Sequence, residues 1–154
     1  MTGPPTSRGT PLSAAQTPLW FAHHLAPDVA LTVALHVRLD GPIDRRRLHD
    51  ALYRVGSESG LRQSRLVPDA TAPADPARAR LVLVDDAPMN YSVVDLSGTG
   101  DRADDDERSD PYAAAEAWAA AEHRRPVDVA GTDLVRVALL IVDDTPGRER
   151  ALLY

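Results

Sequence analysis

The sequence contains no cysteine, no lysine and only one phenylalanine among its 154 residues. The absence of cysteine excludes disulfides, cysteine-based metal sites and a cysteine nucleophile. All 17 basic residues are arginines, and the net charge of -6 argues against a nucleic-acid-binding domain, which would present a basic patch. No apolar run approaches the length of a membrane span, and the N-terminal residues have neither the basic nor the apolar region that is typical of a secretory leader. We therefore expect a cytoplasmic protein that binds neither nucleic acid nor a membrane.

A chain of 154 residues suits one domain with a sizeable core, here preceded by a flexible leader over residues 1–11. Capping residues and helical spacing of apolar side chains predict helices over 14–25, 44–55 and 111–125. Apolar runs and alternation predict strands over 31–39, 61–67, 81–84, 91–94, 134–142 and 151–154. Helices and strands alternate, but the last two strands are predicted to form a hairpin. The fold class is therefore α/β (α+β), with a mixed sheet and flanking helices.

Two apolar patterns define the predicted sheet. Residues 134–142 are apolar at every position except Arg136, which is typical of a strand covered on both faces. Residues 31–39 instead alternate, which predicts a strand with one face on the core. A turn-rich loop over 143–147 predicts that residues 151–154 return as the hairpin partner. Because this last run is still apolar at Tyr154, we expect the chain to be a piece of a longer one.

Few polar residues suggest a site. His23, His24 and Asp28 have a spacing that can place an imidazole base beside a carboxylate. However, Pro27 breaks the helix between them, and we interpret the two histidines as complementing the helix dipole. Arg62 lies at the start of a predicted strand, where a buried arginine would need a carboxylate partner. On pattern alone we expect Arg62 to be exposed, and we predict no catalytic, cofactor-binding or metal-binding residue.

Four segments, in this order along the chain, resemble motifs of nonribosomal peptide synthetase condensation domains. They are the Ser-x-Ala-Gln segment and aromatic in 11–20, the strand–turn–helix from 38 to 52, Glu58-x-x-Leu61-Arg62, and the strand approach over 126–139. The third segment is similar to a motif usually written Arg-His-Glu-x-Leu-Arg, but Gly56 and Ser57 replace its first two residues. The resemblance covers nearly all of residues 12–154.

The resemblance implies that residues 12–154 form the N-terminal lobe of a chloramphenicol-acetyltransferase-like fold. A complete condensation domain joins a carrier-bound acyl or peptidyl thioester to a carrier-bound amino acid, forming an amide. Its His-His-x-x-x-Asp-Gly motif would lie just beyond Tyr154, so we expect this chain to be truncated before the motif and inactive alone. The Arg matching Arg62 supports the active site by pairing with the Asp of that motif.

The implied partners are the donor and acceptor carrier proteins, with their phosphopantetheine arms, and the C-terminal lobe of the same domain. No directly bound cofactor is expected. Two alternatives stay open. The chain could belong to another thioester-dependent acyltransferase of the same superfamily, or it could be a non-catalytic docking or scaffold module. The sequence does not indicate the donor or acceptor substrates.

Overall fold

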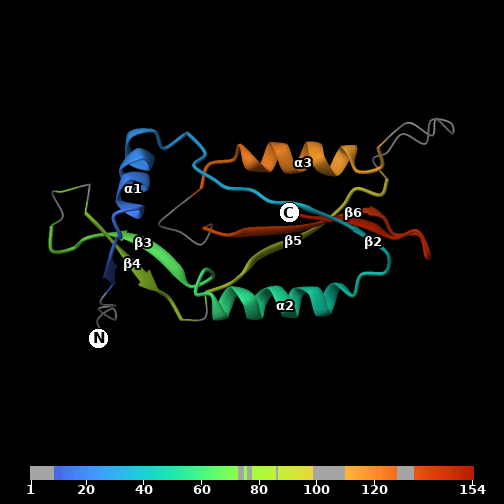
Figure 1. Cartoon of the computed structure of the whole chain (residues 1–154), viewed down its shortest axis with the longest axis horizontal. Coiled ribbons are helices and arrows are strands. Elements are labelled where there is room, and N and C mark those ends of the chain that lie inside the picture. The colour runs from blue at the N-terminus through green and yellow to red at the C-terminus, as the bar shows by residue number, and fades with distance from the viewer. Residues whose placement is uncertain (1–8, 73–74, 76–77, 86, 99–109, 128–133) are drawn as a thin grey trace, which may run out of the picture. The chain divides into compact units, whose positions relative to one another are not determined.

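The computed structural model describes residues 9–72, 75, 78–85, 87–98, 110–127 and 134–154. Its elements (Figure 1) are β1 (Thr10–Pro11), α1 (Gln16–Leu25), β2 (Val37–Asp40), α2 (Arg45–Glu58), β3 (Ser64–Pro68), β4 (Ala79–Leu83), β5 (Asn90–Asp95), α3 (Ala113–His123), β6 (Arg136–Asp143) and β7 (Arg150–Leu153). Within these ranges no helix is long and apolar enough to cross a membrane. The chain divides into two compact units, which are described separately.

The first unit comprises Met1–Leu31, Tyr53–Met89 and Pro126–Val135. Its sheet has three strands in the order β1-β4-β3, and both pairs are antiparallel. Thr10 and Pro11, which we expected in the flexible leader, pair with β4 instead. Strand β1 is an edge strand, where a proline is tolerated because one side of the strand makes no ladder hydrogen bonds.

Helix α1 begins with the predicted capping box. The N–H of Ser13 donates to Oε1 of Gln16 at 2.9 Å, and the N–H of Gln16 donates to Oγ of Ser13 at 3.3 Å. These bonds satisfy backbone donors that a helix start leaves unpaired. Pro18 lies in the first turn of the helix, where its missing N–H costs little. Trp20, further along the helix, is buried.

The second unit comprises Thr32–Leu52, Asn90–Arg125 and Arg136–Tyr154. Its sheet has the strand order β2-β7-β6-β5. Strands β5 and β6 are parallel, whereas β7 is antiparallel to both β6 and β2. The predicted mixed sheet and the predicted C-terminal hairpin are therefore both confirmed.

The core of the second unit lies on both faces of β6 and β7. On one face Leu140 and Leu152 pack with Ala115 of α3. On the other face Leu139 and Ala151 pack with partly buried side chains that include Leu48 of α2. Because successive residues of a strand point to opposite faces, a continuous apolar run is what a strand between two helices requires.

The prediction for residues 31–39 is only partly right. Strand β2 begins at Val37, and residues 31–36 form no strand. Val33 is 95% exposed and Leu35 is 81% exposed, so neither lies on a core. The last β2–β7 pair is Val37 with Leu153, and residues 31–36 pair with no strand among the residues that the structure describes. Alternation predicts the period of a strand, but it does not predict whether a neighbouring strand is present to bury one of its faces.

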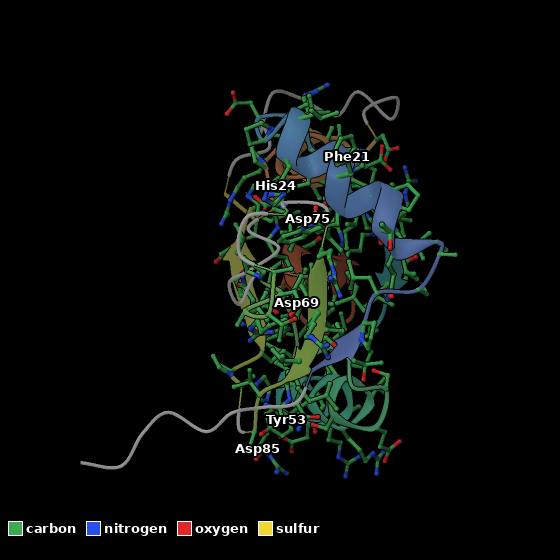
Figure 2. All side chains as sticks on the ribbon, turned by 90° about the vertical axis from the view of Figure 1, so that its left-hand side faces the viewer. Phe21, His24, Tyr53, Asp69, Asp75 and Asp85 are labelled. Carbon is green, nitrogen blue, oxygen red and sulfur yellow. The ribbon has the colours of Figure 1, made fainter. Side chains whose placement is uncertain are left out.

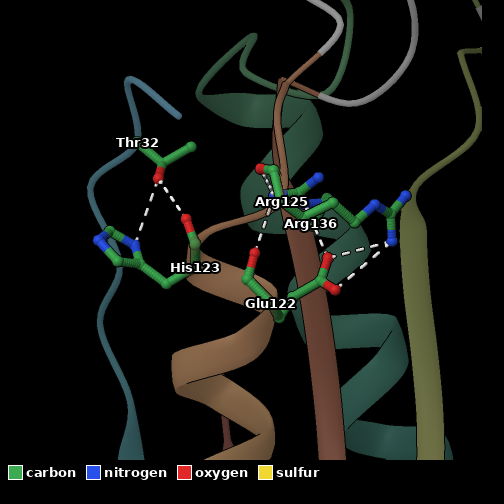
Figure 3. Close-up of polar contacts among 5 residues, drawn as sticks. All are labelled: Thr32, Glu122, His123, Arg125 and Arg136. Carbon is green, nitrogen blue, oxygen red and sulfur yellow. Dashed lines mark hydrogen bonds and ion pairs between the residues drawn. The ribbon is translucent and has the colours of Figure 1, made fainter. Parts of the chain in front are cut away.

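A nearly buried ion pair joins the end of α3 to the start of β6 (Figure 3). Nε of Arg136 lies 3.0 Å from Oε1 of Glu122. Nη2 of Arg136 also donates to the carbonyl oxygens of Glu122, at 3.3 Å, and Arg125, at 3.0 Å. A helix end leaves such carbonyls without partners inside the helix. The one polar position of residues 134–142 is thus explained, since Arg136 caps the helix that covers this sheet.

Candidate functional site

Arg62 lies in the first unit, in the turn between α2 and β3. Its backbone N–H donates to the carbonyl of Gly56 at 3.2 Å, and Gly60 makes the turn at φ 71°. Strand β3 begins at Ser64, three residues later than predicted. The side chain of Arg62 is buried, with 8% of the residue exposed. The expectation of an exposed arginine is therefore wrong, because the turn folds the side chain back along the end of α2.

The guanidinium of Arg62 is held by an aromatic ring and two oxygens. It lies over the Tyr53 ring, 4.3 Å from the centroid, and Nε donates to Oγ of Ser57 at 3.2 Å. Nη1 donates to the carbonyl oxygen of Ala87. Ser57 is one of the two residues that depart from the family pattern, and its hydroxyl here orients the arginine. Tyr53, which contributes this ring from α2, is labelled in Figure 2.

The positive charge of Arg62 has no carboxylate within ion-pair distance among the residues that the structure describes. A buried charge costs several kcal/mol unless an opposite charge or several hydrogen bonds compensate it. The contacts of Arg62 hold the plane of its guanidinium group, but the hydrogen-bond acceptors are neutral and do not balance its charge. This arrangement can bind a carboxylate brought to it by another segment.

Arg65, three residues after Arg62, is a second buried arginine, and the sequence pattern did not predict its burial. Only 6% of it is exposed, and Nη1 donates to the carbonyl oxygens of Arg62, at 3.1 Å, and Ser64, at 2.6 Å. Polar and apolar residues do not alternate along β3, so the sequence pattern does not predict which of its side chains are buried. Arg65 therefore supports the backbone around Arg62 from within β3.

Asp69 is the only acidic residue buried among the described part of the chain, and it lies just after β3 (Figure 2). The hydroxyl and the N–H of Thr71 donate to its Oδ1 at 2.7 Å and 3.0 Å. These bonds, with Nε of Arg80 at 3.3 Å, lower the pKa of Asp69 to about 2. The carboxylate is thus committed to a turn and a neighbouring arginine, which makes it a structural group.

The histidines stay at the end of α1. His23 and His24 are both in its last turn, and Nδ1 of His24 lies 3.4 Å from the carbonyl oxygen of Trp20. No contact between Asp28 and either imidazole is seen. Across the described ranges, no three His, Asp or Glu side chains are grouped so that they could hold a metal ion. The structure thus offers no acid–base pair at this position.

A cavity of about 160 Å³ lies in the second unit, between the start of α2 and the β6–β7 hairpin. Its charged lining consists of Arg45, Asp143, Asp144, Glu149 and Arg150. Arg45 is paired with Asp144 at 2.8 Å, and Arg150 lies 3.5 Å from Asp40. Because both arginines already have acidic partners and the other charged residues of the lining are carboxylates, the cavity offers no free cation to hold an anionic ligand.

The chain was compared with protein families, with known sequences and with solved structures. No family model matches the chain. An isonitrile lipopeptide synthase from Streptomyces coeruleorubidus is 34% identical over 144 residues, which is 90% of this chain but only 8% of that synthase. The solved starter condensation domain of rhizomide synthetase RzmA is 26% identical, with a TM-score of 0.71, over 96% of this chain and 33% of that one.

The first condensation domain of the calcium-dependent antibiotic synthetase, solved with a substrate analogue, shares the fold at 24% identity and a TM-score of 0.72. It is matched over 96% of this chain and 32% of its own. The chain thus spans about a third of the solved domains that it matches. The resemblance to condensation domains and the chloramphenicol-acetyltransferase-like fold are both confirmed.

Proposed function

Because this chain has the fold of part of a nonribosomal peptide synthetase condensation domain, we propose that it is the N-terminal lobe of such a domain. The observation that carries the proposal is the match to condensation domains over 96% of the chain, with similarity in both fold and sequence. The complete domain would transfer an acyl group from a carrier-bound thioester to the amine of a carrier-bound amino acid. The new C–N bond forms as the C–S bond breaks, and the donor thiol leaves with the proton of the amine.

The neighbouring structures support a thioester donor. One RzmA starter domain was solved in complex with C8-CoA and Leu-SNAC, an acyl thioester together with an aminoacyl thioester. For this chain, the donor and acceptor would be presented on the phosphopantetheine arms of two carrier proteins. The C-terminal lobe of the same domain would complete the channel that receives them. The cytoplasm, where carrier proteins are loaded, is the compartment we propose.

Arg62 has the features of a positioning residue in such a domain. It is buried, its plane is fixed by Tyr53 and Ser57, and its charge has no acidic partner among the described residues. We assign it the role of holding the Asp carboxylate of the His-His-x-x-x-Asp-Gly motif, which this chain does not contain. A bidentate arginine–carboxylate pair fixes the orientation of the carboxylate, and hence of the loop that carries it.

The test is a condensation assay with two proteins. One is the chain of residues 1–154, and the other is a longer product of the same reading frame that includes the histidine motif. Donor carriers loaded with an octanoyl or an aminoacyl group are mixed with an aminoacyl acceptor carrier, and products are followed by mass spectrometry. We expect an amide from the longer protein only. An amide from residues 1–154 above background would contradict the proposal that this chain is one lobe of the domain. In a parallel assay with alcohol acceptors, an ester formed in the absence of any amide would indicate a different acyltransferase.

A further inference from the structure

The chain passes between the two units at five places, which follow residues 31, 52, 89, 125 and 135. On the side of the second unit, three of these places are flanked by Thr32, Arg125 and Arg136. These three residues belong to separate segments of the sequence, yet Figure 3 shows all of them around the end of α3. Three of the points where the chain enters or leaves the second unit are therefore gathered at one helix end.

Glu122, in the last turn of α3, holds two of these points. Its Oε1 lies 3.2 Å from Nη1 of Arg125 and 3.0 Å from Nε of Arg136. Only 14% of the Glu122 side chain and 10% of the Arg136 side chain are exposed, so salt screens their ion pair less than it screens a surface pair. Nη2 of Arg136 also donates to the carbonyl oxygen of Arg125 at 3.0 Å. The two residues that flank the stretch 126–135, which belongs to the first unit, are thus bonded directly to each other.

The third point is held by the side chain of Thr32. Its hydroxyl donates to the carbonyl oxygen of His123 at 3.1 Å, and its Oγ1 also lies 3.2 Å from Nδ1 of the same residue (Figure 3). Every other residue from 31 to 36 is exposed, including Val33 at 95% and Leu35 at 81%. A bond from a hydroxyl to a carbonyl contributes less than the charge-assisted bonds of a nearly buried arginine. Thr32 is therefore the weakest of the three attachments.

We propose that Thr32, Glu122, His123, Arg125 and Arg136 form a clasp that limits the relative motion of the two units, and that the Thr32 arm of the clasp opens first. Hinge motions are absorbed by a few residues at the ends of elements, and Arg125 follows α3 while Arg136 begins β6. Holding these ends to one helix leaves fewer residues free to change φ and ψ. The clasp thereby also limits how far the buried arginines of the first unit can move relative to the apolar core of the second.

The absence of cysteine allows this motion to be measured directly, because two introduced cysteines are then the only attachment sites for spin labels. Leu83→Cys on β4 places one label in the first unit, and Ala117→Cys on α3 places the other in the second unit. Both side chains are exposed, so the labels need not disturb a core. Pulsed electron–electron double resonance then gives the distribution of distances between the two labels.

Thr32→Val removes the hydroxyl of the clasp but keeps the branched shape of the side chain. We expect it to raise the share of distances outside the native peak about fivefold, the change that one net hydrogen bond predicts. Thr32→Ser keeps a hydroxyl and should leave the distribution native. Thr17→Val is the matched control, because the Thr17 hydroxyl donates to the carbonyl oxygen of Ser13 at 3.0 Å, within the first unit. Glu122→Gln, which removes both ion pairs, should widen the distribution more than Thr32→Val does.

Amide hydrogen exchange at Val82 and Leu140, which are buried in the two sheets, reports whether each unit stays folded. A native distribution in Thr32→Val, with both reporters still protected, would overturn the proposal. So would equal widening in Thr17→Val, because the effect would then follow the loss of any hydroxyl. Widening in Glu122→Gln without any in Thr32→Val would overturn it as well, because the Thr32 arm would then not open first. If Glu122→Gln loses protection at Leu140, the comparison of Thr32→Val with Thr32→Ser still decides.

Discussion

The two units of this chain have opposite interiors. In the second unit, the three largest side chains that are completely buried are Leu139, Leu140 and Leu152, all on the two central strands. In the first unit, the buried residues include three charged ones, Arg62, Arg65 and Asp69. An apolar interior is stable by itself, whereas buried charges need partners. We infer that the second unit contributes most of the apolar stability, whereas the first unit holds buried charged groups that can bind a partner of opposite charge.

The same turn occurs in both units and shows the difference in a matched pair. Asp69 and Asp95 each accept hydrogen bonds from the hydroxyl and the N–H of the residue two places later, Thr71 and Ser97. The hydroxyl bonds are 2.7 Å in both turns. Asp95 is exposed, but Asp69 is buried beside arginines. Identical local chemistry is thus placed at the surface of one unit and in the interior of the other.

The largest expected effect is in the apolar interior. Leu140→Ala removes a completely buried side chain between β6 and α3, and we expect it to lower the free energy of unfolding by about 2–5 kcal/mol. Leu83→Ala, in the first unit, changes a side chain that is mostly exposed and should cost less than about 1 kcal/mol. Urea denaturation followed by amide exchange in β6 and β7 checks both. Equal losses would mean that the second unit is not the more stable core.

A smaller effect is expected in acid. The pKa of Asp69 is about 2 in the folded chain, against 3.8 ordinarily, so its carboxylate stabilises the first unit above pH 3.8. This contribution is lost as the pH falls from 3.8 to about 2. Thr71→Val removes the hydroxyl donor, so it should raise the pKa of Asp69 and reduce the acid-dependent loss of stability. The measurement is an NMR titration of the carboxyl carbon, together with urea midpoints of β3 and β4 at each pH.

The matched control is Ser97→Ala. The pKa of Asp95 is also lowered, chiefly by the Ser97 hydroxyl, so this variant should raise it as well. Because Asp95 is exposed, we expect little change in the stability of the second unit. An acid-dependent loss that is the same in the native chain and in Thr71→Val would contradict the role given to Asp69.

Sequence reasoning predicted the parts of the fold that depend on local pattern. The capping box of Ser13 and Gln16, the buried strand that begins at Arg136 and the C-terminal hairpin all follow from the order of residue types. Burial that depends on distant neighbours was not predictable. Leu35 and Val33 have strand alternation but no paired strand, and Arg62 is buried by a turn that brings it against Tyr53 and Ala87.

The candidate site was predicted only in part, for the same reason. The motif resemblance identified Arg62, although the pattern alone suggested an exposed residue. The burial of Arg65 could not be predicted, because a polar residue on a short strand can point either to the buried face or to the exposed face of the sheet. His49 is half-buried, and its ring lies 5.2 Å from that of Tyr91. Such contacts depend on which strand lies beneath the helix, and local pattern does not specify that.

The role of Arg62 is the central claim, and one pair of measurements tests it most directly. Arg62→Met keeps most of the side-chain volume, and it removes both the hydrogen bonds to Ser57 and Ala87 and a charge without an acidic partner in the described residues. These losses oppose each other, so we expect the free energy of unfolding of residues 1–154 to change by less than about 1 kcal/mol. In the longer protein that contains the histidine motif, the same variant should lower the condensation rate by about tenfold or more without a matching loss of stability.

Arg62→Lys is the control, because it keeps the charge and loses the planar fork, and we expect it to restore only part of the rate. A loss of several kcal/mol in residues 1–154 would contradict the positioning role, since Arg62 would then be a structural residue of the first unit. A wild-type condensation rate for Arg62→Met in the longer protein would contradict it as well.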